Sequence, residues 1–499
     1  MLTAGLGGVT RRGSAAISSA GRLLGVCEQE RITRIRNAGF DESGLPGEAI
    51  DALLQRLGRS RDDIDKYVLA EAERDAAACG PCDRIDHHLA HASTAYRSSP
   101  FQSAAIIVCD HDAPKVSVWQ GAGSTLTREE WPWRGPGFAD VYSLCAQAFG
   151  FDGPAGDQRF EALARLSGAQ GDDGMGTLLT GDGHLLEVAA GFQGAIEQRL
   201  PARAPRAGAA SARLAATVEA RLKDLFLELV ARVREQVEEQ NLCLGGSFFY
   251  HSSINTAVRR SGLFARVFTP VDPGNTGVAV GAALHADACP PSVASPFLGP
   301  SYAPDVIKET LDNCKLQYNW ESEDDAIRIA VDALRQGTLV AWFDGAMEWG
   351  PRALGARCIL ANPFAPFVLE NLNRFLKRRE PWRGYALSGL DAAVQDHFDG
   401  PPTAPFMECD YRPRDPGRFK HALPSPEAAI RVQTVGSEAP PRFRRLLEAF
   451  GAAAGWPFLV NTSFNAFHEP MVCSPRDAVR VFYGSGVDVL ILDQFVLRK

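Results

Sequence analysis

The sequence has no long apolar run, and no segment approaches the roughly 20 apolar residues that a membrane-spanning helix needs. The stretch after Arg11-Arg12, residues Gly13–Gly21, is too weakly apolar for the core of a secretory signal. Positive charge is not in excess either: 52 Lys and Arg against 60 Asp and Glu give a net charge of −8, whereas nucleic-acid-binding surfaces are usually basic. We therefore expect a cytoplasmic protein that binds neither membranes nor nucleic acid.

The number and spacing of the cysteines do not indicate a disulfide framework. The eleven cysteines are scattered and odd in number, which is typical of reduced thiols in a chain without an export signal. Cys79-Gly80-Pro81-Cys82 has the form of a dithiol redox site, but such a site needs a strand before it and a helix beneath it. The preceding residues 73–78 read as helix or loop, so we interpret this spacing as coincidence.

A pattern of short strands occurs twice in the first half of the chain. Three strands are predicted near the start, followed by an amphipathic helix that ends at Gly58 and a fourth strand. About a hundred residues later three strands follow one another again. The repetition predicts a duplicated α/β lobe, as in actin-like and hexokinase-like folds that bind a nucleotide between two lobes. The predicted strands are Leu2–Thr10, Ala15–Ser19, Leu23–Cys27 and Tyr67–Ala70, then Ala104–Cys109, Val116–Trp119 and Ser124–Arg128.

The 499 residues are too many for one ordinary core. A long apolar stripe predicts a helix over Arg213–Gln240, leading to a strand that ends in Gly245-Gly246, where paired glycines let a backbone approach a ligand. Residues 286–304 are rich in proline and small residues. We place the domain boundary there and expect domains over residues 1–290 and 305–499. Beyond it, helix Asp324–Gln336, strand Thr338–Phe343, a helix capped by Ser474 and strand Val487–Leu492 predict a second α/β unit.

Three of the ten histidines lie within five residues, in Asp86-His87-His88-Leu89-Ala90-His91. If Asp86 caps a helix, His87 and His91 share one face, and this spacing suits two imidazoles on one metal ion. His88 and His91 are a second geometric option, and a solvated helix face is the alternative. Asp110, at the end of a predicted strand, is a candidate oxygen ligand.

A basic segment stands out against the acidic background. Residues 345–383 hold seven basic and three acidic residues, and Gly350, Pro351 and Gly355 frame Arg352 tightly. Guanidinium groups bind phosphate oxygens in pairs, so we predict a phosphate site here. A solvated basic helix face accounts for Lys377–Arg379 but not for Arg352.

Amides and hydroxyls cluster in Asn461-Thr462-Ser463-Phe464-Asn465, directly after a predicted strand. A carbamoyl group offers both donors and acceptors, and these side chains can satisfy both. A turn built by Asx and Ser/Thr side chains is the alternative.

Taken in order, these segments resemble the NodU/CmcH-type carbamoyltransferase family. The resemblance covers nearly the whole chain, and the ordered set is specific although each motif alone is weak. The matching stretches are Glu28–Arg34, His87–Ala92, Asp110, Leu242–Gly246, Gly277–Ala283, Trp349–Gly355, Arg378–Arg383, Arg431–Val435 and Asn461–Asn465.

The resemblance implies a TsaD-like N-terminal domain of actin/hexokinase type and a YrdC-like C-terminal domain. It implies that the C-terminal half makes carbamoyl-adenylate from carbamoyl phosphate and ATP with Mg²⁺. The N-terminal half would transfer the carbamoyl group to a small-molecule acceptor. A homodimer is one oligomeric state that we expect. His87, His91 and Asp110 would ligate a divalent metal, with Fe²⁺ expected, and His87, Arg352 and Arg383 would be catalytic. Carbamoyl phosphate and ATP would be bound by Arg352, Ala353, Leu354, Gly355, Arg383, Arg431, Asn461 and Ser463, with Gly245, Gly246 and Asn275.

The chain departs from the family in its transfer half. The usual His-Asp pair of the first turn is replaced by Thr10-Arg11-Arg12, and Asn275 stands where the family has an aspartate, with Asp272 three residues earlier. A base from elsewhere, for which Asp112, His111 and His251 are candidates, or an unusual acceptor would explain the first change. Two alternatives are a protein that activates without transferring and a nucleotide-binding protein with a decayed site. Family Gly-Glu-x-Lys becomes Gly156–Arg159, and the family Arg-Gly after Asn465 becomes Phe467-His468.

Overall fold

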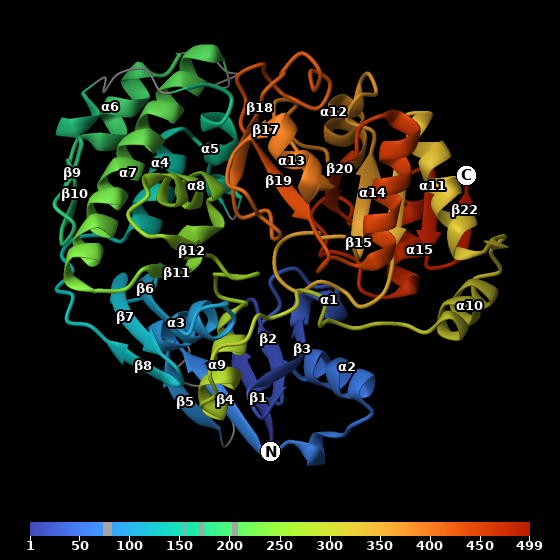
Figure 1. The fold of residues 1–499 in the computed structure, drawn as a ribbon, viewed down its shortest axis with the longest axis horizontal. Helices are drawn as coiled ribbons and strands as arrows, with labels where there is room; N and C mark the ends of the chain where they lie inside the picture. The colour runs from blue at the N-terminus through green and yellow to red at the C-terminus, as the bar shows by residue number, and fades with distance from the viewer. Residues whose placement is uncertain (73–81, 154, 169–173, 202–207) are drawn as a thin grey trace.

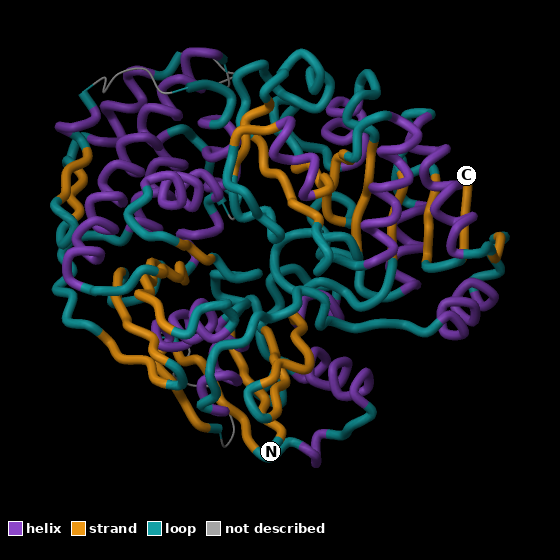
Figure 2. Tube along the Cα trace, in the orientation of Figure 1, coloured by secondary structure: helices purple, strands orange, loops and turns teal. Residues whose placement is uncertain are grey.

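A computed structural model describes residues 1–72, 82–153, 155–168, 174–201 and 208–499. Figure 1 shows two small sheets at the bottom, a group of helices at the upper left and a large sheet at the upper right. Figure 2 shows how much of the space between these parts is crossed by loops rather than by regular elements.

The two small sheets have the same topology. In each, a central strand pairs antiparallel with the next strand and parallel with a later one, so the strand orders β3-β2-β1-β4-β5 and β8-β7-β6-β11-β12 correspond position by position. The predicted duplication and the mixed α/β class are confirmed. The strands of the first sheet are β1 (Leu2–Gly7), β2 (Ser14–Ser19), β3 (Arg22–Glu28), β4 (Lys66–Glu71) and β5 (Asp83–Asp86). Those of the second are β6 (Ser103–Cys109), β7 (Val116–Ala122), β8 (Thr125–Arg128), β11 (Asn241–Gly245) and β12 (Arg266–Phe268).

Two helices lie between these sheets. Helix α9 (Val278–Asp287) packs on β1, β2 and β4, α3 (His87–Arg97) packs on β6 and β11, and the two helices pack against each other. Strands β1 and β6 are buried over nearly their whole lengths, which is typical of a central strand covered on both faces. Polar side chains on α3 are therefore placed at the junction of the two lobes.

Two of the remaining helices were predicted from the sequence, the second of them with both ends four residues too late, at Arg213–Gln240. Helix α2 (Gly47–Leu57) buries Ile50, Leu53 and Leu54 and ends at Gly58 in the left-handed conformation, as a glycine after the last turn favours. Helix α7 (Ala209–Gln236) buries its apolar stripe. The other helices before residue 290 are α1 (Gln29–Thr33), α4 (Phe138–Ala148), α5 (Gly156–Ala164), α6 (Phe192–Arg199) and α8 (Ser252–Ser261), and a small hairpin contains β9 (Leu179–Gly181) and β10 (Leu186–Val188).

The second half of the chain forms one mixed sheet of ten strands, in the order β13-β22-β21-β14-β15-β20-β16-β19-β18-β17. Apolar side chains pack on both faces, one of which is covered by α11 and α14. The strands are β13 (Asn319–Trp320), β14 (Val340–Phe343), β15 (Arg357–Ala361), β16 (Ala386–Leu390), β17 (Phe398–Asp399), β18 (Asp410–Pro413), β19 (Ile430–Val435), β20 (Phe458–Ser463), β21 (Val489–Leu492) and β22 (Phe495–Arg498). The helices are α10 (Pro304–Asn313), α11 (Glu323–Arg335), α12 (Val368–Glu370), which continues as a π-helix over Asn371–Leu376, α13 (Asp391–His397), α14 (Pro441–Ala454) and α15 (Pro475–Tyr483). The predicted cap is present, since Ser474 accepts a hydrogen bond from the Asp477 amide.

The proline-rich segment between the halves is held by both of them. The amide of Val26 in β3 donates to the carbonyl of Leu298 at 3.1 Å, and the amide of Ser292 donates to the carbonyl of Arg97. On the other side, the amide of Trp349 donates to the carbonyl of Pro296 at 2.9 Å. We call residues 289–300 the strap.

Cys79 of the dithiol motif lies outside the described residues. Apart from Cys82 of the same motif, the described cysteines are free thiols. Among the described helices, none is both long and apolar enough to cross a lipid bilayer.

Candidate functional site

Three predicted ligands meet at the N-terminal end of α3. The Nε2 atoms of His87 and His91 lie 3.1 Å apart, and Oδ2 of Asp110 lies 3.2 Å from the first and 3.6 Å from the second. All three side chains are buried. Atoms bound to one metal ion at about 2.1 Å lie about 3.0 to 3.4 Å apart for bond angles of 90° to 109°. The three residues fit a divalent ion, and we refer to them as the His-Asp cluster.

The local sequence explains why the cluster forms. Asp86 caps α3 by accepting a hydrogen bond from the Leu89 amide at 2.8 Å, so residues i and i+4 fall on one face. Burial alone would raise the pKa of Asp110, but the hydrogen bonds and charges of His87 and His91 outweigh it and hold that pKa well below its usual range. The carboxylate is therefore ionised, as a metal ligand must be.

The paired glycines after β11 support this cluster through the backbone. Gly246 has φ +105°, and a Cβ there would lie 2.1 Å from the carbonyl oxygen of Cys109, so only glycine allows this close approach. The next residue, Ser247, donates from its amide to Oδ1 of Asp110 at 3.0 Å, and its hydroxyl donates to the same oxygen. Gly245 and Gly246 thus position Asp110.

Asn275, and not Asp272, lies at the cluster. Oδ1 of Asn275 is 3.2 Å from Nε2 of His91. The carboxylate of Asp272 instead accepts hydrogen bonds from the Tyr250 hydroxyl at 2.6 Å, from the Gly274 amide and from the Thr276 hydroxyl. Asp272 therefore stabilises the turn that carries Asn275.

His88 is not part of the cluster. Its ring contacts the Ser117 hydroxyl at 2.7 Å and the carbonyl oxygen of Asp112 at 3.2 Å, so the His88–His91 option is wrong. Burial, followed by the neighbouring His91, lowers the pKa of His88 to about 4. A neutral ring is suited to this structural position.

The three candidate bases lie in different surroundings. Oδ2 of Asp112 is 3.5 Å from Nε2 of His87. His111 points away from the cluster to Asp140 of α4 at 3.0 Å. His251 is stacked on the Tyr142 ring at 3.6 Å between centroids. Asp112 is the one of the three whose side chain is recorded in contact with the cluster.

The predicted phosphate loop joins β14 to β15. The buried Glu348 side chain holds this loop in shape. Its Oε1 accepts hydrogen bonds from the amides of Leu354, Ala356 and Arg357 at 2.7 to 3.2 Å. This pattern explains the Gly and Pro residues of the motif, because a loop can only wrap one carboxylate if its backbone turns sharply.

The Glu28–Arg34 motif in the N-terminal half forms hydrogen bonds with that loop. Glu28 accepts a hydrogen bond from the Gly350 amide at 2.7 Å, while the Arg31 guanidinium donates to the Gly350 carbonyl at 2.9 Å. Arg34 donates to the carbonyl of Pro470 at 2.7 Å. This motif thus has a structural role: it connects the first small sheet to the loop that carries Arg352.

Arg352 and Arg383 are half-buried cations with few carboxylates nearby. Burial and then Arg431 lower the pKa of Arg352 to about 9, while burial and then Arg379 lower that of Arg383 to about 10. Arg352 donates to the Tyr250 carbonyl at 3.2 Å, and no ion pair of it is found within the described part of the chain. Arg383 lies 3.9 Å from the Glu380 carboxylate.

Arg431 has a protein carboxylate as its partner. Its Nη2 donates to Glu161 of α5 at 2.6 Å, and its Nε donates to the Ser252 hydroxyl at 2.8 Å. Arg165 bonds the other oxygen of Glu161 and also Asp410 at 2.9 Å. We call Glu161, Arg165, Ser252, Asp410 and Arg431 the bridging network, because it joins α5 and α8 to β18 and β19. Arg431 was predicted as a site residue, but its pairing with Glu161 could not be predicted from sequence, because the members of the network are far apart in the chain.

Asn461 and Ser463 are held by other polar groups at the end of β20. Nδ2 of Asn461 donates to the carbonyl of Ala353 at 3.0 Å and to the Ser388 hydroxyl at 2.9 Å. The ammonium of Lys377 donates to the carbonyl of Ser463 at 2.7 Å and to Oδ1 of Asn465 at 2.6 Å. Lys377 is buried, and burial lowers its pKa well below the usual range. The solvated-face interpretation is therefore wrong for Lys377.

The residues at the two remaining departures from the family pattern also form polar contacts. Arg159, in the altered Gly156–Arg159 motif, forms an ion pair with Glu380 at 2.6 Å, and Asp157 accepts a hydrogen bond from Ser143 at 2.9 Å. The His468 ring contacts the Arg36 guanidinium at 3.1 Å.

Gly355 is expected to be sensitive to substitution. Its φ of +130° is a glycine conformation, and a Cβ would lie 2.6 Å from the Phe443 ring. We expect Gly355→Ala to lower the free energy of unfolding by about 2–4 kcal/mol, through strain and overpacking. Gly345→Ala is the control: at φ +55° its Cβ meets nothing within 4 Å, and the cost should be about 1 kcal/mol. Urea unfolding of both variants measures this, and equal losses would contradict it.

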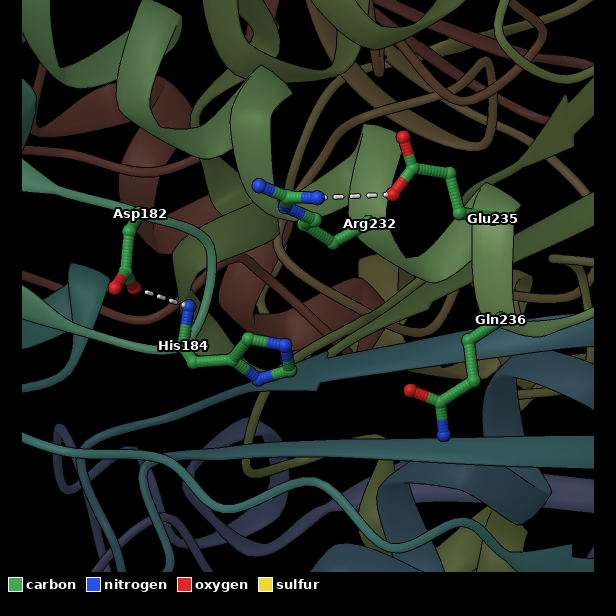
Figure 3. Close-up of a pocket in the computed structure, with 5 residues that line it drawn as sticks. All are labelled: Asp182, His184, Arg232, Glu235 and Gln236. Atoms are coloured by element: carbon green, nitrogen blue, oxygen red, sulfur yellow. Dashed lines mark hydrogen bonds and ion pairs between the residues drawn. The ribbon is translucent and has the colours of Figure 1, made fainter.

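A polar pocket elsewhere is lined by Asp182, His184, Arg232, Glu235 and Gln236 (Figure 3). Its charges pair locally: Arg232 bonds Glu235 at 3.1 Å, and Asp182 accepts from the His184 amide at 2.9 Å. None of the predicted site residues lines it.

Comparison with known proteins agrees with the motifs in both halves. The family description "Carbamoyltransferase N-terminus" matches residues 74–284, and "Carbamoyltransferase C-terminus" matches residues 331–499. An uncharacterized protein of Synechocystis, sll1178, is 30% identical over 97% of this chain and 95% of its own length. Nodulation protein NolNO of Sinorhizobium fredii is 26% identical over 98% of this chain and 79% of its own. Nodulation protein U of Bradyrhizobium diazoefficiens is 31% identical over 45% of this chain and 39% of its own.

Among solved structures, full-length HypF with bound phosphate and nucleotide aligns with a TM-score of 0.38 and 10% identity, over 57% of this chain and 46% of its own. Both family descriptions match in order along one chain, and the Synechocystis relative matches it over nearly the whole length of both chains. The chain therefore belongs to the carbamoyltransferase family of enzymes.

Proposed function

We propose that this enzyme uses carbamoyl phosphate and ATP to form carbamoyl-adenylate, and that it transfers the carbamoyl group to a hydroxyl or amine of a small-molecule natural product. Water releases phosphate from carbamoyl phosphate, a carbamate oxygen attacks the α-phosphorus of ATP, and pyrophosphate leaves. The acceptor then attacks the carbamoyl carbon and displaces AMP.

The observation that carries this proposal is the group of half-buried arginines around the 350–355 loop. Arg352 and Arg383 each have a pKa lowered by burial and by another arginine nearby. Buried cations without matching carboxylates are costly unless an anion joins them. A guanidinium fork binds phosphate oxygens in pairs, so a phosphate group supplies the missing charge.

The other predicted ligands, in the loop and in the strands beside it, have the following roles in this proposal. Ala353 and Leu354 present backbone carbonyls that accept from Asn461 and Gln433, which fixes the loop beside Arg352. Arg431 stays on Glu161 and acts by adding positive potential. Asn461 and Ser463, at the end of β20, are proposed to face the carbamoyl group together with Gly355.

The His-Asp cluster is proposed to hold a divalent ion, with Fe²⁺ as the expected metal. Such an ion supplies Lewis acidity that polarises a carbonyl and neutralises phosphate charge. His87 and His91 would donate Nε2, and Asp110 would donate Oδ2, while Ser247 keeps the carboxylate oriented. The nucleotide is proposed to bind between the small sheets, near Gly245, Gly246 and Asn275.

Carbamoyl-phosphate-dependent exchange of labelled pyrophosphate into ATP tests the activation step. We expect exchange with the native chain in the presence of Mg²⁺ and Fe²⁺, and none when carbamoyl phosphate is omitted. Absence of exchange in the complete mixture would contradict adenylate formation. Pyrophosphate release without a carbamoylated product, across a panel of alcohols and amines, would instead locate the fault in the transfer step.

A further inference from the structure

Tyr250 lies at a contact between the two halves of the chain. Its backbone carbonyl accepts a hydrogen bond from Nη2 of Arg352 at 3.2 Å, and its hydroxyl donates to Oδ1 of Asp272 at 2.6 Å. Within the described part of the chain, this carbonyl is the one hydrogen-bond acceptor found for the Arg352 guanidinium. The position of the guanidinium therefore depends on where the backbone of Tyr250 is held.

The side chain of Tyr250 is held by the turn before α9. Besides the Tyr250 hydroxyl, the Asp272 carboxylate binds the Gly274 amide at 2.9 Å and the Thr276 hydroxyl. A Cβ at Gly274 would lie 2.2 Å from the Tyr250 hydroxyl oxygen, so the end of the ring rests on the backbone of this turn. Desolvation and then the Asp272 carboxylate raise the pKa of Tyr250 well above its usual range. The hydroxyl therefore stays protonated and donates.

The backbone at Tyr250 is also connected to the His-Asp cluster. Tyr250 ends the 3₁₀ turn Ser247–Tyr250. Ser247, at the start of that turn, donates from its amide to Oδ1 of Asp110 at 3.0 Å. A 3₁₀ turn rises about 2.0 Å per residue, so the two ends are about 6 Å apart. This short segment therefore sets the distance between the group that holds Asp110 and the group that holds Arg352.

Charge explains why Arg352 needs a support of this kind. Arg431 and Arg165 repel the half-buried Arg352, while Glu161 attracts it. Before an anion binds, like charges thus act to move the guanidinium away from the other arginines of the phosphate site. A carboxylate partner would hold it but would also compete with a phosphate for its charge. A neutral carbonyl holds the guanidinium and leaves its charge available.

We propose that Tyr250 is a positioning residue for the phosphate site: its hydroxyl, through Asp272, fixes the carbonyl that holds Arg352 ready for the phosphate of carbamoyl phosphate. This inference rests on the phosphate site in the proposed function. It means that the first half of the chain completes a site whose predicted arginines all belong to the second half.

Tyr250→Phe tests the role of the hydroxyl, because it keeps both the ring and the backbone carbonyl. In carbamoyl-phosphate-dependent pyrophosphate exchange, we expect the KM for carbamoyl phosphate to rise about three- to tenfold with kcat within about twofold of native, the scale of one lost hydrogen bond. Calorimetry with inorganic phosphate should show a Kd raised by the same factor, without turnover. Tyr96→Phe is the matched control: its hydroxyl donates to the Gln102 carbonyl at 2.7 Å, and the change should alter neither constant.

The double variant Tyr250→Phe, Arg352→Ala separates positioning from a general loss of structure. If Tyr250 acts through Arg352, adding Tyr250→Phe to Arg352→Ala should change the residual exchange rate, at subsaturating carbamoyl phosphate, by less than about twofold. A merely structural role predicts the same loss in both backgrounds, and a lower kcat in place of a higher KM. Either of these results, or native-like phosphate affinity of Tyr250→Phe, would overturn the inference.

Failure of the proposed function gives a different set of results. If the native chain binds inorganic phosphate more tightly than Arg352→Ala does but catalyses no exchange, adenylate formation is wrong, and the phosphate titrations decide the role of Tyr250. If the native chain and Arg352→Ala bind phosphate equally, Arg352 holds no phosphate, and the inference fails as well.

Discussion

Replacing Arg352 by alanine is expected to lower the rate of carbamoyl-phosphate-dependent pyrophosphate exchange by about 10² to 10³-fold, as is usual when one charge-stabilising group is removed from an active site. The same change should leave the free energy of unfolding equal or higher, because it removes a half-buried cation that has no ion pair among the described residues. Loss of activity without loss of stability is the signature of a group held ready for a ligand.

Two variants make this result interpretable. Arg352→Lys keeps one positive charge but loses the planar fork, so it should retain only part of the exchange activity. Arg374→Ala removes an arginine from the same basic segment, but one whose side chain is 71% exposed and paired with Glu370, and exchange should be unchanged. Exchange within threefold of the native rate in Arg352→Ala would exclude Arg352 from the phosphate site.

Replacing Glu161 by glutamine is expected to destabilise the fold by about 3–5 kcal/mol, the cost of removing one partner from a buried ionic network. Arg165 and Arg431 would then share only Asp410 and Ser252. Urea unfolding at pH 7 measures the loss. Glu448→Gln, in an exposed pair with Arg444, is the control, with an expected cost below about 1 kcal/mol.

The same substitution should also change how the free energy of unfolding depends on pH under acidic conditions. Burial raises the pKa of Glu161, but Arg165, Arg431 and His251 outweigh it and hold the pKa well below 4.5. A carboxyl with a lowered pKa contributes stability that is complete above its unfolded-state value and is lost as pH falls through its folded-state value. The difference between the native chain and Glu161→Gln should therefore be constant near neutral pH and shrink below about pH 4.5. A pH-independent difference would contradict this assignment.

Local geometry made much of the His-Asp cluster predictable from sequence. Asp86 identifies the start of α3, and the helical period then puts His87 and His91 together without knowledge of the fold. The same logic failed for His88, because its partners, Ser117 and the Asp112 carbonyl, belong to the β6–β7 connection. Helical spacing alone does not distinguish the i+3 pair from the i+4 pair.

The duplicated lobes were predictable for a similar reason, since each repeats the same order of short strands. Long-range pairing was not. Nothing near Arg431 in sequence indicates Glu161, and nothing near Lys377 indicates the carbonyl of Ser463. Glu161 lies 270 positions from Arg431 in the chain, and the acceptors of Lys377 lie 86 and 88 positions from it. The sequence therefore did not indicate that Lys377, in the basic segment, is buried.

The strap shows that composition and mechanical role can differ. Its prolines and small residues resemble those of a linker, where insertions are usually tolerated. Its backbone nevertheless bonds Val26 on one side and Trp349 on the other, two residues from Glu28 and three from Arg352. For protein engineering, this is therefore a poor place to exchange halves between relatives or to insert a tag. A change in the strap would disturb both strand β3 and the loop that carries Arg352.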